Sequence, residues 1–386
     1  KLGFEKPMEH HCNAVWWRLK GVIDITDWSD NQEWRDYPDV KLRYLSTVHF
    51  LDKGYWVWVI PLGSKNTSIG IVADPAYHPF ETFNTYENAL SWLKENEPLI
   101  YEKLEPETPN KMDFKILRHY AHHTGRLYDG NQRWGVTGEA GAFLDPFYSP
   151  GTDFISMNNT WLSDLILREM KGEDVTFRAE IYEQTHLALV DSWIPIYQNK
   201  YSLMGKTQIM TTKILWDWAI YWAVPALMFT NKAFTDLQMI KKLFVAQNSL
   251  GQRFRTLHNQ MQQLFLDWAP YDNEIFADKY IDPVDLSYML EFQTNIPKQH
   301  EGDELLSQIS KNMEILEQVA VEIFRRVSTQ VKGTSPELKV NPYTMVLDAE
   351  GTLNLPETID ETNIEPSETI KRDVDVMWFY EKLVTA

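Results

Sequence analysis

One stretch of the chain, residues 138–152, reads GEAGAFLDPFYSPGT and joins a predicted strand at residues 133–137 to a predicted helix at residues 153–171. Glycine and alanine let a backbone approach a bound molecule closely. The unpaired amides at the start of a helix favour anionic or oxygen-rich groups. A strand, a small-residue turn and a helix start therefore suit a cofactor, although ordinary strand-to-helix connections share this pattern.

The order of the residues in this stretch is more informative than its turn chemistry. It resembles the second flavin-contacting motif of FAD-dependent monooxygenases related to p-hydroxybenzoate hydroxylase, typically Gly-Asp-Ala-Ala-Gly-Phe-x-Asp-Pro-x-x-Ser-x-Gly. Upstream, WVWVIP at residues 56–61 is similar to the Trp-x-Trp-x-Ile-Pro signature of the flavin-dependent halogenase branch. Two motifs in the expected order indicate this branch, and the resemblance extends over about residues 10–200.

The resemblance implies a role for each residue that matches the two motifs. The cofactor-binding positions are Gly138, Glu139, Asp145, Pro146, Gly151 and Thr152. The positions at the reaction centre are Trp56, Trp58 and Ser149. In the related halogenases the tryptophan pair lines the passage between flavin and substrate. Taken by themselves, two tryptophans on one face of a strand are more simply core residues.

The resemblance also implies a chemistry. It indicates an FAD-dependent oxidoreductase that acts through a flavin C4a-hydroperoxide on an aromatic or unsaturated small molecule, either free or bound to a carrier. Reduced FAD would come from a separate flavin reductase. Chloride or bromide would be the halide, held near residues 149–151.

Three residues depart from the family pattern. Glu139 replaces the aspartate that binds the ribityl hydroxyls, so one extra methylene must be accommodated. Pro150 has no amide hydrogen, at a position whose backbone amide is associated with halide in the tryptophan halogenases. Tyr148 stands where those enzymes carry an essential glutamate, which argues against tryptophan as the substrate. A halide-independent flavin hydroxylase or oxidoreductase is therefore an alternative.

The Gly-x-Gly-x-x-Gly fingerprint of the first cofactor-binding half is missing from this sequence. Residues 1–7 resemble the segment that follows that half in the halogenases, and the lysine used for halogen transfer belongs to the missing part. No catalytic lysine can therefore be assigned here. A second alternative follows, in which the chain is a substrate-binding subunit completed by a partner chain with the dinucleotide-binding fold.

Hydrophobic periodicity predicts an α+β fold, and the resemblance implies the antiparallel sheet of a p-hydroxybenzoate hydroxylase-type flavoprotein followed by a mainly helical region. The expected regions are the substrate-side sheet at 1–132, the second flavin motif with its helix at 133–172, and the helical region at 173–386, with an acidic extended segment at 347–372. Predicted strands are 13–25, 44–50, 55–62, 67–73 and 114–127, of which the first four form an antiparallel meander. Predicted helices are 86–103, 153–171, 176–198, 206–230, 236–268, 303–329 and 374–383.

Composition narrows the partners and the cellular compartment. The formal net charge of −18 disfavours nucleic acids and anionic membranes as partners, because both repel an acidic surface. A single cysteine, Cys12, excludes an intramolecular disulfide and fits a reducing cytoplasm. The most apolar segment, residues 214–229, is too short to span a bilayer and predicts a buried helix.

Several further side chains leave two interpretations open. His122 and His123 lie beside His119 but point to opposite faces of a strand, so no metal site is predicted. Arg126 and Arg133 flank the turn before the flavin motif, where they either meet a phosphate or form surface ion pairs. Five tryptophans of the helical region either wall a substrate pocket or only pack helix against helix: Trp193, Trp216, Trp218, Trp222 and Trp268.

Overall fold

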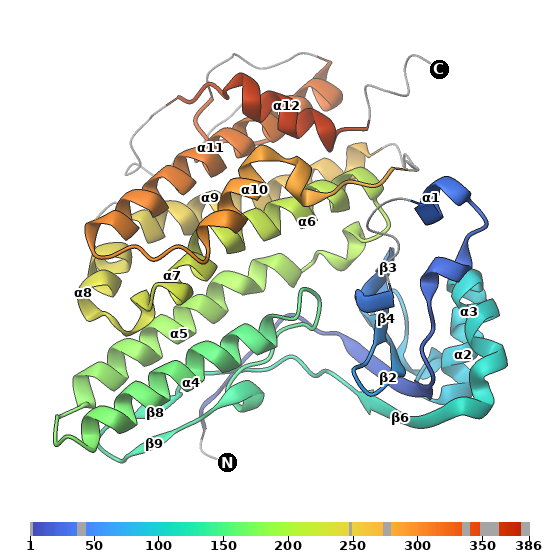
Figure 1. The fold of residues 1–386 in the computed structure, drawn as a ribbon, viewed down its shortest axis with the longest axis horizontal. Helices are drawn as coiled ribbons and strands as arrows, with labels where there is room; N and C mark the ends of the chain where they lie inside the picture. Colours follow the sequence, from blue (N-terminus) through green and yellow to red (C-terminus); the bar gives the residue numbers. More distant parts are fainter. Residues whose placement is uncertain are drawn as a thin grey trace.

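The computed structural model describes residues 3–36, 44–246, 249–272, 279–333, 340–347 and 363–379. Figure 1 shows a sheet region, covered on its outer side by two helices, beside a larger region built almost entirely of helices. The predicted α+β fold, an antiparallel sheet followed by a mainly helical region, is confirmed.

The main sheet is formed by β2 (Asn13–Lys20), β3 (Val48–Asp52), β4 (Tyr55–Pro61), β5 (Asn66–Ala73) and β6 (Lys111–Leu117). Within the described residues, these five strands are antiparallel and lie in the order β3-β4-β5-β2-β6. The predicted meander is correct for β3 to β5 but wrong for β2, which pairs with β5 and β6. Ala14 and Val15 point to opposite faces of β2 and both are buried, so this strand belongs inside the sheet.

The two faces of the sheet contact different hydrophobic cores. Trp17 and Val57 pack under α2 (Tyr86–Asn96) and α3 (Pro98–Leu104), which form the outer layer in Figure 1. Trp56, one position before Val57, points to the other face and belongs to the larger core of the helical region. The sheet is therefore covered on both sides.

The helix predicted at 86–103 is broken into α2 and α3. Pro98 opens α3, and a residue that precedes proline is disfavoured in a helical conformation. Glu97 accordingly has φ −135° and ψ 65°, which ends α2 one residue earlier.

The strand predicted at 114–127 is wrong in extent, because β6 ends at Leu117. His119 has φ +46°, a left-handed conformation that does not continue a strand. The chain then forms β7 (His123–Thr124), which pairs with β1 (Glu5–Lys6), and the hairpin of β8 (Tyr128–Asp129) and β9 (Trp134–Gly135).

The helices pack in layers, with α4 beside α5 and α11 beside α9 and α12. Their bounds are α1 (Gln32–Asp36), α4 (Pro150–Glu169), α5 (Thr176–Tyr197), α6 (Thr207–Tyr221), α7 (Leu227–Thr230), α8 (Leu237–Ile240), α9 (Leu250–Trp268), α10 (Ser287–Asn295), α11 (Asp303–Lys332) and α12 (Glu368–Val376). Short 3-10 turns occur at η1 (Ile25–Trp28), η3 (Phe80–Thr82), η4 (Glu105–Asn110), η5 (Gly138–Ala140), η6 (Tyr201–Leu203), η8 (Ala233–Thr235), η10 (Ala269–Tyr271) and η11 (Pro283–Asp285).

Two long predicted helices are interrupted. The helix predicted at 206–230 contains η7 (Trp222–Ala226), a π-helical turn around Pro225, because proline has no amide hydrogen for the α-helical ladder. The helix predicted at 236–268 contains a second π-helical turn, η9 (Lys241–Val245), and α9 begins after it with Ser249 as its N-cap.

The end of the chain also differs from expectation. Most of the extended segment predicted at 347–372 lies outside the described residues, but its last part is helical, since Ser367 caps the start of α12. The helix predicted at 374–383 therefore begins at Glu368, and residues 380–383 lie outside the described residues. Trp378 stacks on Trp268 of α9 with ring centroids 5.3 Å apart, which docks this end on the helical region.

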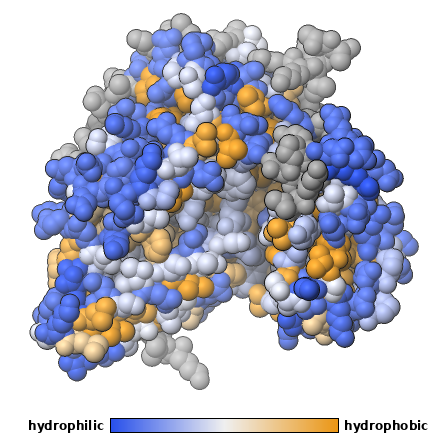
Figure 2. Space-filling model, in the orientation of Figure 1, coloured by the Kyte–Doolittle hydropathy of each residue, from blue (hydrophilic) through white to orange (hydrophobic). Residues whose placement is uncertain are grey.

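Among the helices in the described ranges, none is long and apolar enough to cross a membrane. Figure 2 shows that this face of the molecule is hollowed between the sheet region and the helical region. The turn that carries the flavin-like motif joins β9 to α4, and β8, the partner strand of β9, contacts α5 of the helical region.

Candidate functional site

The motif turn is held by the segment just before it. The predicted strand at 133–137 shrinks to β9, and Gly138 then adopts φ +64°, a conformation that glycine takes without strain. His122 and Phe143 form an isolated antiparallel bridge with N···O distances of 2.8 and 2.9 Å. The helix begins at Pro150, three residues before its predicted start, because proline suits the first helical position.

The carboxylate of Asp145 is the centre of a buried hydrogen-bond cluster. It accepts hydrogen bonds from the hydroxyls of Tyr201 at 2.7 Å and Tyr120 at 3.0 Å, and His10 Nε2 lies 2.7 Å from the same oxygen. Its second oxygen accepts the backbone amide of Phe147 at 2.9 Å. Burial, followed by the negative charge of Asp145, raises the pKa of both tyrosine hydroxyls well above the usual value, so both remain donors.

This cluster links the two sequence motifs. The indole nitrogen of Trp56 donates a hydrogen bond to the hydroxyl of Tyr201 at 2.9 Å, and Tyr201 in turn donates to Asp145. Trp56 also contacts Phe147, with ring centroids 5.4 Å apart. The first motif is therefore fixed against the second through η6, which lies in the helical region.

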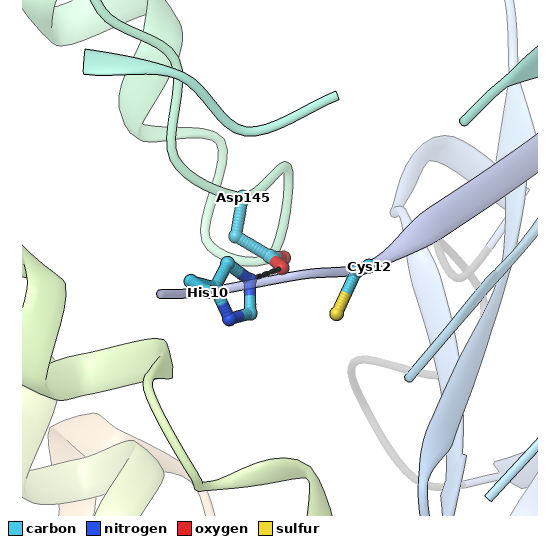
Figure 3. A group of neighbouring side chains, drawn as sticks. All are labelled: His10, Cys12 and Asp145. Atoms are coloured by element: carbon cyan, nitrogen blue, oxygen red, sulfur yellow. Dashed lines mark hydrogen bonds and ion pairs between the residues drawn. The ribbon is translucent and has the colours of Figure 1, made fainter. Parts of the chain in front are cut away.

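Figure 3 shows a potential metal-ligand set, in which His10 and Asp145 point toward one another and the Cys12 thiol points into the same space. The three ligand atoms lie within 4.8 Å of one another, and all three residues are buried. Burial, and then the charge of Asp145, raises the pKa of the Cys12 thiol well above its usual value, whereas metals bind the thiolate. Both Asp145 oxygens already accept hydrogen bonds, so this carboxylate is satisfied without a metal ion. That the protein binds no metal here is still a prediction from the sequence.

The tryptophan pair lies on one sheet face as the strand period requires. Trp56 is buried and Trp58 half-buried, with ring centroids 5.4 Å apart. Trp58 donates to the hydroxyl of Ser68 at 3.1 Å, and its ring lies directly over Gly70, where any Cβ would overlap it. Both side chains are thus fixed in place by the sheet and by the motif turn.

The start of α4 has an unusual backbone. Tyr148 and Ser149 have φ +67° and +55°, so two successive non-glycine residues are left-handed, a conformation that costs free energy and is concentrated at functional sites. The side chain of Glu139 reaches back onto this helix end, and a Cβ on Gly151 would overlap its carboxylate oxygen. Thr152 and Ser149 are exposed beside it.

A cavity of about 230 Å³ lies behind the motif turn, on its helical side. It is lined by Tyr148, Pro150, Asp153, Ser192, Trp193, Ile196, Asp217, Trp218, Ile220, Tyr221, Trp222, Phe254 and His258. Trp193, Trp218 and Trp222 are therefore pocket residues, whereas Trp216 and Trp268 are buried in the core. Trp56 and Trp58 do not belong to its lining.

Asp217, which lines this cavity, belongs to a buried ion pair. Lys213 and Asp217 lie one turn apart on α6, with Nζ 2.5 Å from Oδ2, and both are 2% exposed. The same carboxylate accepts hydrogen bonds from the Tyr148 hydroxyl at 3.0 Å and from Gln262 Nε2 at 2.7 Å. Tyr148, the residue in place of the family's glutamate, is thus tied to the helical region by a carboxylate that comes from α6.

The two arginines that flank the turn form ion pairs on the surface. Arg126 pairs with Glu183 at 3.1 Å, and Arg133 pairs with Glu169 at 2.7 Å. The interpretation as surface ion pairs therefore describes this structure better than phosphate contacts.

Comparisons with known proteins give a consistent picture. No protein-family model matches the chain. The flavin-dependent halogenase chlA of Dictyostelium discoideum is 26% identical over 266 residues, which cover 61% of this chain and 43% of that protein. The chain is related to flavin-dependent halogenases. A 1H-pyrrole-2-carbonyl-[peptidyl-carrier protein] brominase of Pseudoalteromonas luteoviolacea is also 26% identical, over 142 residues that cover 36% of this chain and 33% of that protein.

The fold is shared with a halogenase of known structure. The crystal structure of halogenase PltM superimposes with a TM-score of 0.53 at 14% identity, covering 81% of this chain and 63% of that one. The sequence-based recognition of the halogenase branch is confirmed by the two curated relatives. The chain spans less than half the length of both curated relatives.

Proposed function

We propose that the chain forms the substrate-side part of an FAD-dependent oxidoreductase of the halogenase type. The observation that supports this most directly is the link from Trp56 through Tyr201 to Asp145, because it joins the two halogenase-like motifs into one rigid unit. A PltM variant has been crystallised with FAD, and its fold matches with a TM-score of 0.52.

The residues present fit a flavin at the start of α4. The first amides of a helix have no partner within the helix, so those of Gly151 and Thr152 face outward from its N-terminus. The positive end of the helix dipole favours an anionic ring system there. Glu139 already lies over this end and offers a carboxylate to sugar-alcohol hydroxyls. When bound, reduced FAD supplies the oxygen-activating chemistry, and the chain positions the substrate and excludes water.

One residue, Pro150, limits the proposal on halide. Pro150 occupies the first position of α4, and because proline has no amide hydrogen its backbone gives no hydrogen bond to chloride or bromide. This favours a halide-independent flavin hydroxylase or oxidoreductase as the second candidate. Halide-dependent product formation separates the two.

The partners proposed from these relationships are a small aromatic substrate, free or carrier-bound, and a separate flavin reductase. The chain matches 43% of the length of the chlA halogenase. A partner chain that brings the dinucleotide-binding fold is therefore compatible with this proposal. A cytoplasmic location is proposed from the single cysteine.

The experiment is an FAD titration of the purified chain, followed by flavin absorbance and fluorescence. Saturable binding that Gly151→Trp abolishes, and that Gly63→Trp leaves intact, is the expected result. Gly63 is the matched control because a Cβ there meets open space. If FAD does not bind, or if both variants behave alike, this chain does not hold the flavin by itself at α4.

A further inference from the structure

The cavity behind the motif turn contains an imidazole whose two nitrogens have no hydrogen-bond partner among the described residues. His258 of α9 is 2% exposed, lines the cavity, and neither of its ring nitrogens has a hydrogen-bond partner. Burial of an unpaired polar group is costly, so such a group calls for an explanation. One turn later on α9, Gln262 uses its amide nitrogen for Asp217, while its buried carbonyl oxygen has no partner.

Burial also sets the charge of this imidazole. It lowers the pKa of His258 to about 4, so the ring is neutral near pH 7. A neutral imidazole has one N–H donor and one bare nitrogen that accepts. It is therefore suited to a ligand with a hydrogen-bonding group of its own and not to an anion.

The walls of the cavity suit a flat apolar body. Trp218 and Trp222 stack on one another with centroids 6.1 Å apart, and Trp193 meets Tyr221 edge to face at 6.3 Å. Aromatic faces of this kind bind flat rings through large, rigid contact areas. A volume of about 230 Å³ corresponds to on the order of eight water molecules, which is room for a compact one- or two-ring compound.

Among the described residues, the cavity lining contains two carboxylates, Asp153 and Asp217, and no lysine or arginine, which disfavours anionic ligands. Lys213 neutralises Asp217, so that pair contributes little net charge. Asp153 is only half-buried and is hydrogen-bonded to Tyr221, and it forms no ion pair with any residue in the described ranges. A ligand carboxylate would meet this uncompensated carboxylate.

We propose that His258 anchors a compact, uncharged aromatic ligand that carries an N–H or O–H group on its ring, with the ring held between Trp193, Trp218 and Trp222. That this ligand is the substrate rests on the proposed function. Its binding requires neither flavin nor halide. The N–H or O–H group of the ligand donates to the bare imidazole nitrogen, which the protein leaves unpaired.

The test is isothermal titration calorimetry of the whole chain, without FAD or halide, with three probes. 3-Methylindole and 1-methylindole are isomers of equal size, but only the first has an N–H group. Loss of one neutral hydrogen bond predicts that 3-methylindole binds about 3- to 10-fold more tightly. Indole-3-acetate, which carries a carboxylate, should bind more weakly than either isomer.

A variant assigns the effect to His258. In His258→Phe the two isomers should bind with equal affinity, whereas Tyr44→Phe, an exposed control, should keep the difference. Near-ultraviolet circular dichroism checks that each variant is folded. If His258→Phe does not fold, the isomer comparison in the unmodified chain still decides.

Three results with the unmodified chain would overturn the proposal. The two isomers could bind with equal affinity, indole-3-acetate could bind as tightly as 3-methylindole, or no probe could bind at all. Because FAD is absent from this experiment, such a failure is distinct from a failure of the flavin titration. Binding here without FAD binding would place the ligand pocket in this chain and the flavin site outside it.

Discussion

The hydroxyl of Tyr201 donates a hydrogen bond to the carboxylate of Asp145 at 2.7 Å, although the two residues lie 56 positions apart. The same hydroxyl accepts the indole N–H of Trp56 from the sheet region. One side chain of the helical region therefore holds both halogenase-like motifs in a fixed relationship. The positions of the tryptophan pair and of the motif turn depend on it.

Tyr201→Phe should lower the free energy of unfolding by about 2–3 kcal/mol, since it removes a hydrogen bond to a buried carboxylate and leaves Trp56 without an acceptor. Urea denaturation followed by tryptophan fluorescence measures this change. The matched control is Tyr44→Phe at an exposed site, where the change should stay within about 0.5 kcal/mol. Equal effects of the two substitutions would contradict a structural role for Tyr201.

The buried pair of Lys213 and Asp217 gives a second prediction. Lys213→Met should destabilise the chain by about 3–5 kcal/mol, because Asp217 remains as a buried charge without its cation. Replacing both partners, Lys213→Met with Asp217→Asn, should restore much of that loss, and denaturant midpoints measure the coupling.

The exposed ion pair of Arg133 and Glu169 serves as the control. Arg133 is 77% exposed, so Arg133→Met should change the stability by less than about 1 kcal/mol. If Lys213→Met is as stable as Arg133→Met, the buried pair does not contribute to the free energy of unfolding.

Two buried histidines predict a loss of stability in mild acid. Burial lowers the pKa of both His186 and His258 to about 4, against about 6.5 in an unfolded chain. Between these values the unfolded state binds more protons, so stability is full above pH 6.5 and falls as the pH drops toward 4. Each histidine should account for about 2 kcal/mol between pH 8 and pH 5.

Urea midpoints at pH 8 and pH 5 test this dependence. His258→Phe should reduce the difference between the two midpoints by the share of one histidine, whereas Leu45→Ala at an exposed site should leave it unchanged. A pH dependence that is the same in His258→Phe and in the unmodified chain would refute the assignment.

Local signals explain what was predictable from the sequence. The motif order and the strand period around Trp56 are each written in a few neighbouring residues. The break at Pro98 is also a local signal, but the predicted helix at 86–103 missed it. The cluster around Asp145 has no such signal, because His10 lies 135 positions away and Tyr120 and Tyr201 reach it from separate segments. Only the tertiary fold brings these polar groups together.

The position of the cavity behind the motif turn could not be predicted from the sequence either. Helical periodicity shows that α6 and α9 bury an apolar face, but it does not show which turn of one helix meets which turn of the other. Trp216 and Trp218 are two positions apart on α6, yet the first is core and the second lines the cavity. Nothing in the sequence around His258 indicates that its ring nitrogens have no hydrogen-bond partner.

The contact between Glu139 and Gly151 gives the last prediction. A Cβ on Gly151 would overlap the Glu139 carboxylate, so Gly151→Ala must displace that side chain from the start of α4. The shorter Glu139→Asp restores the residue of the family pattern and withdraws the carboxylate by one methylene. Gly151→Ala should therefore cost stability in the native chain but should stabilise the Glu139→Asp chain by up to about 1 kcal/mol, because alanine is the better helix former.

A double-mutant cycle of urea midpoints measures this coupling, with Gly63→Ala as the control in open space. If the two substitutions are additive, Glu139 does not rest on the helix end, and its proposed place beside the flavin loses its structural basis.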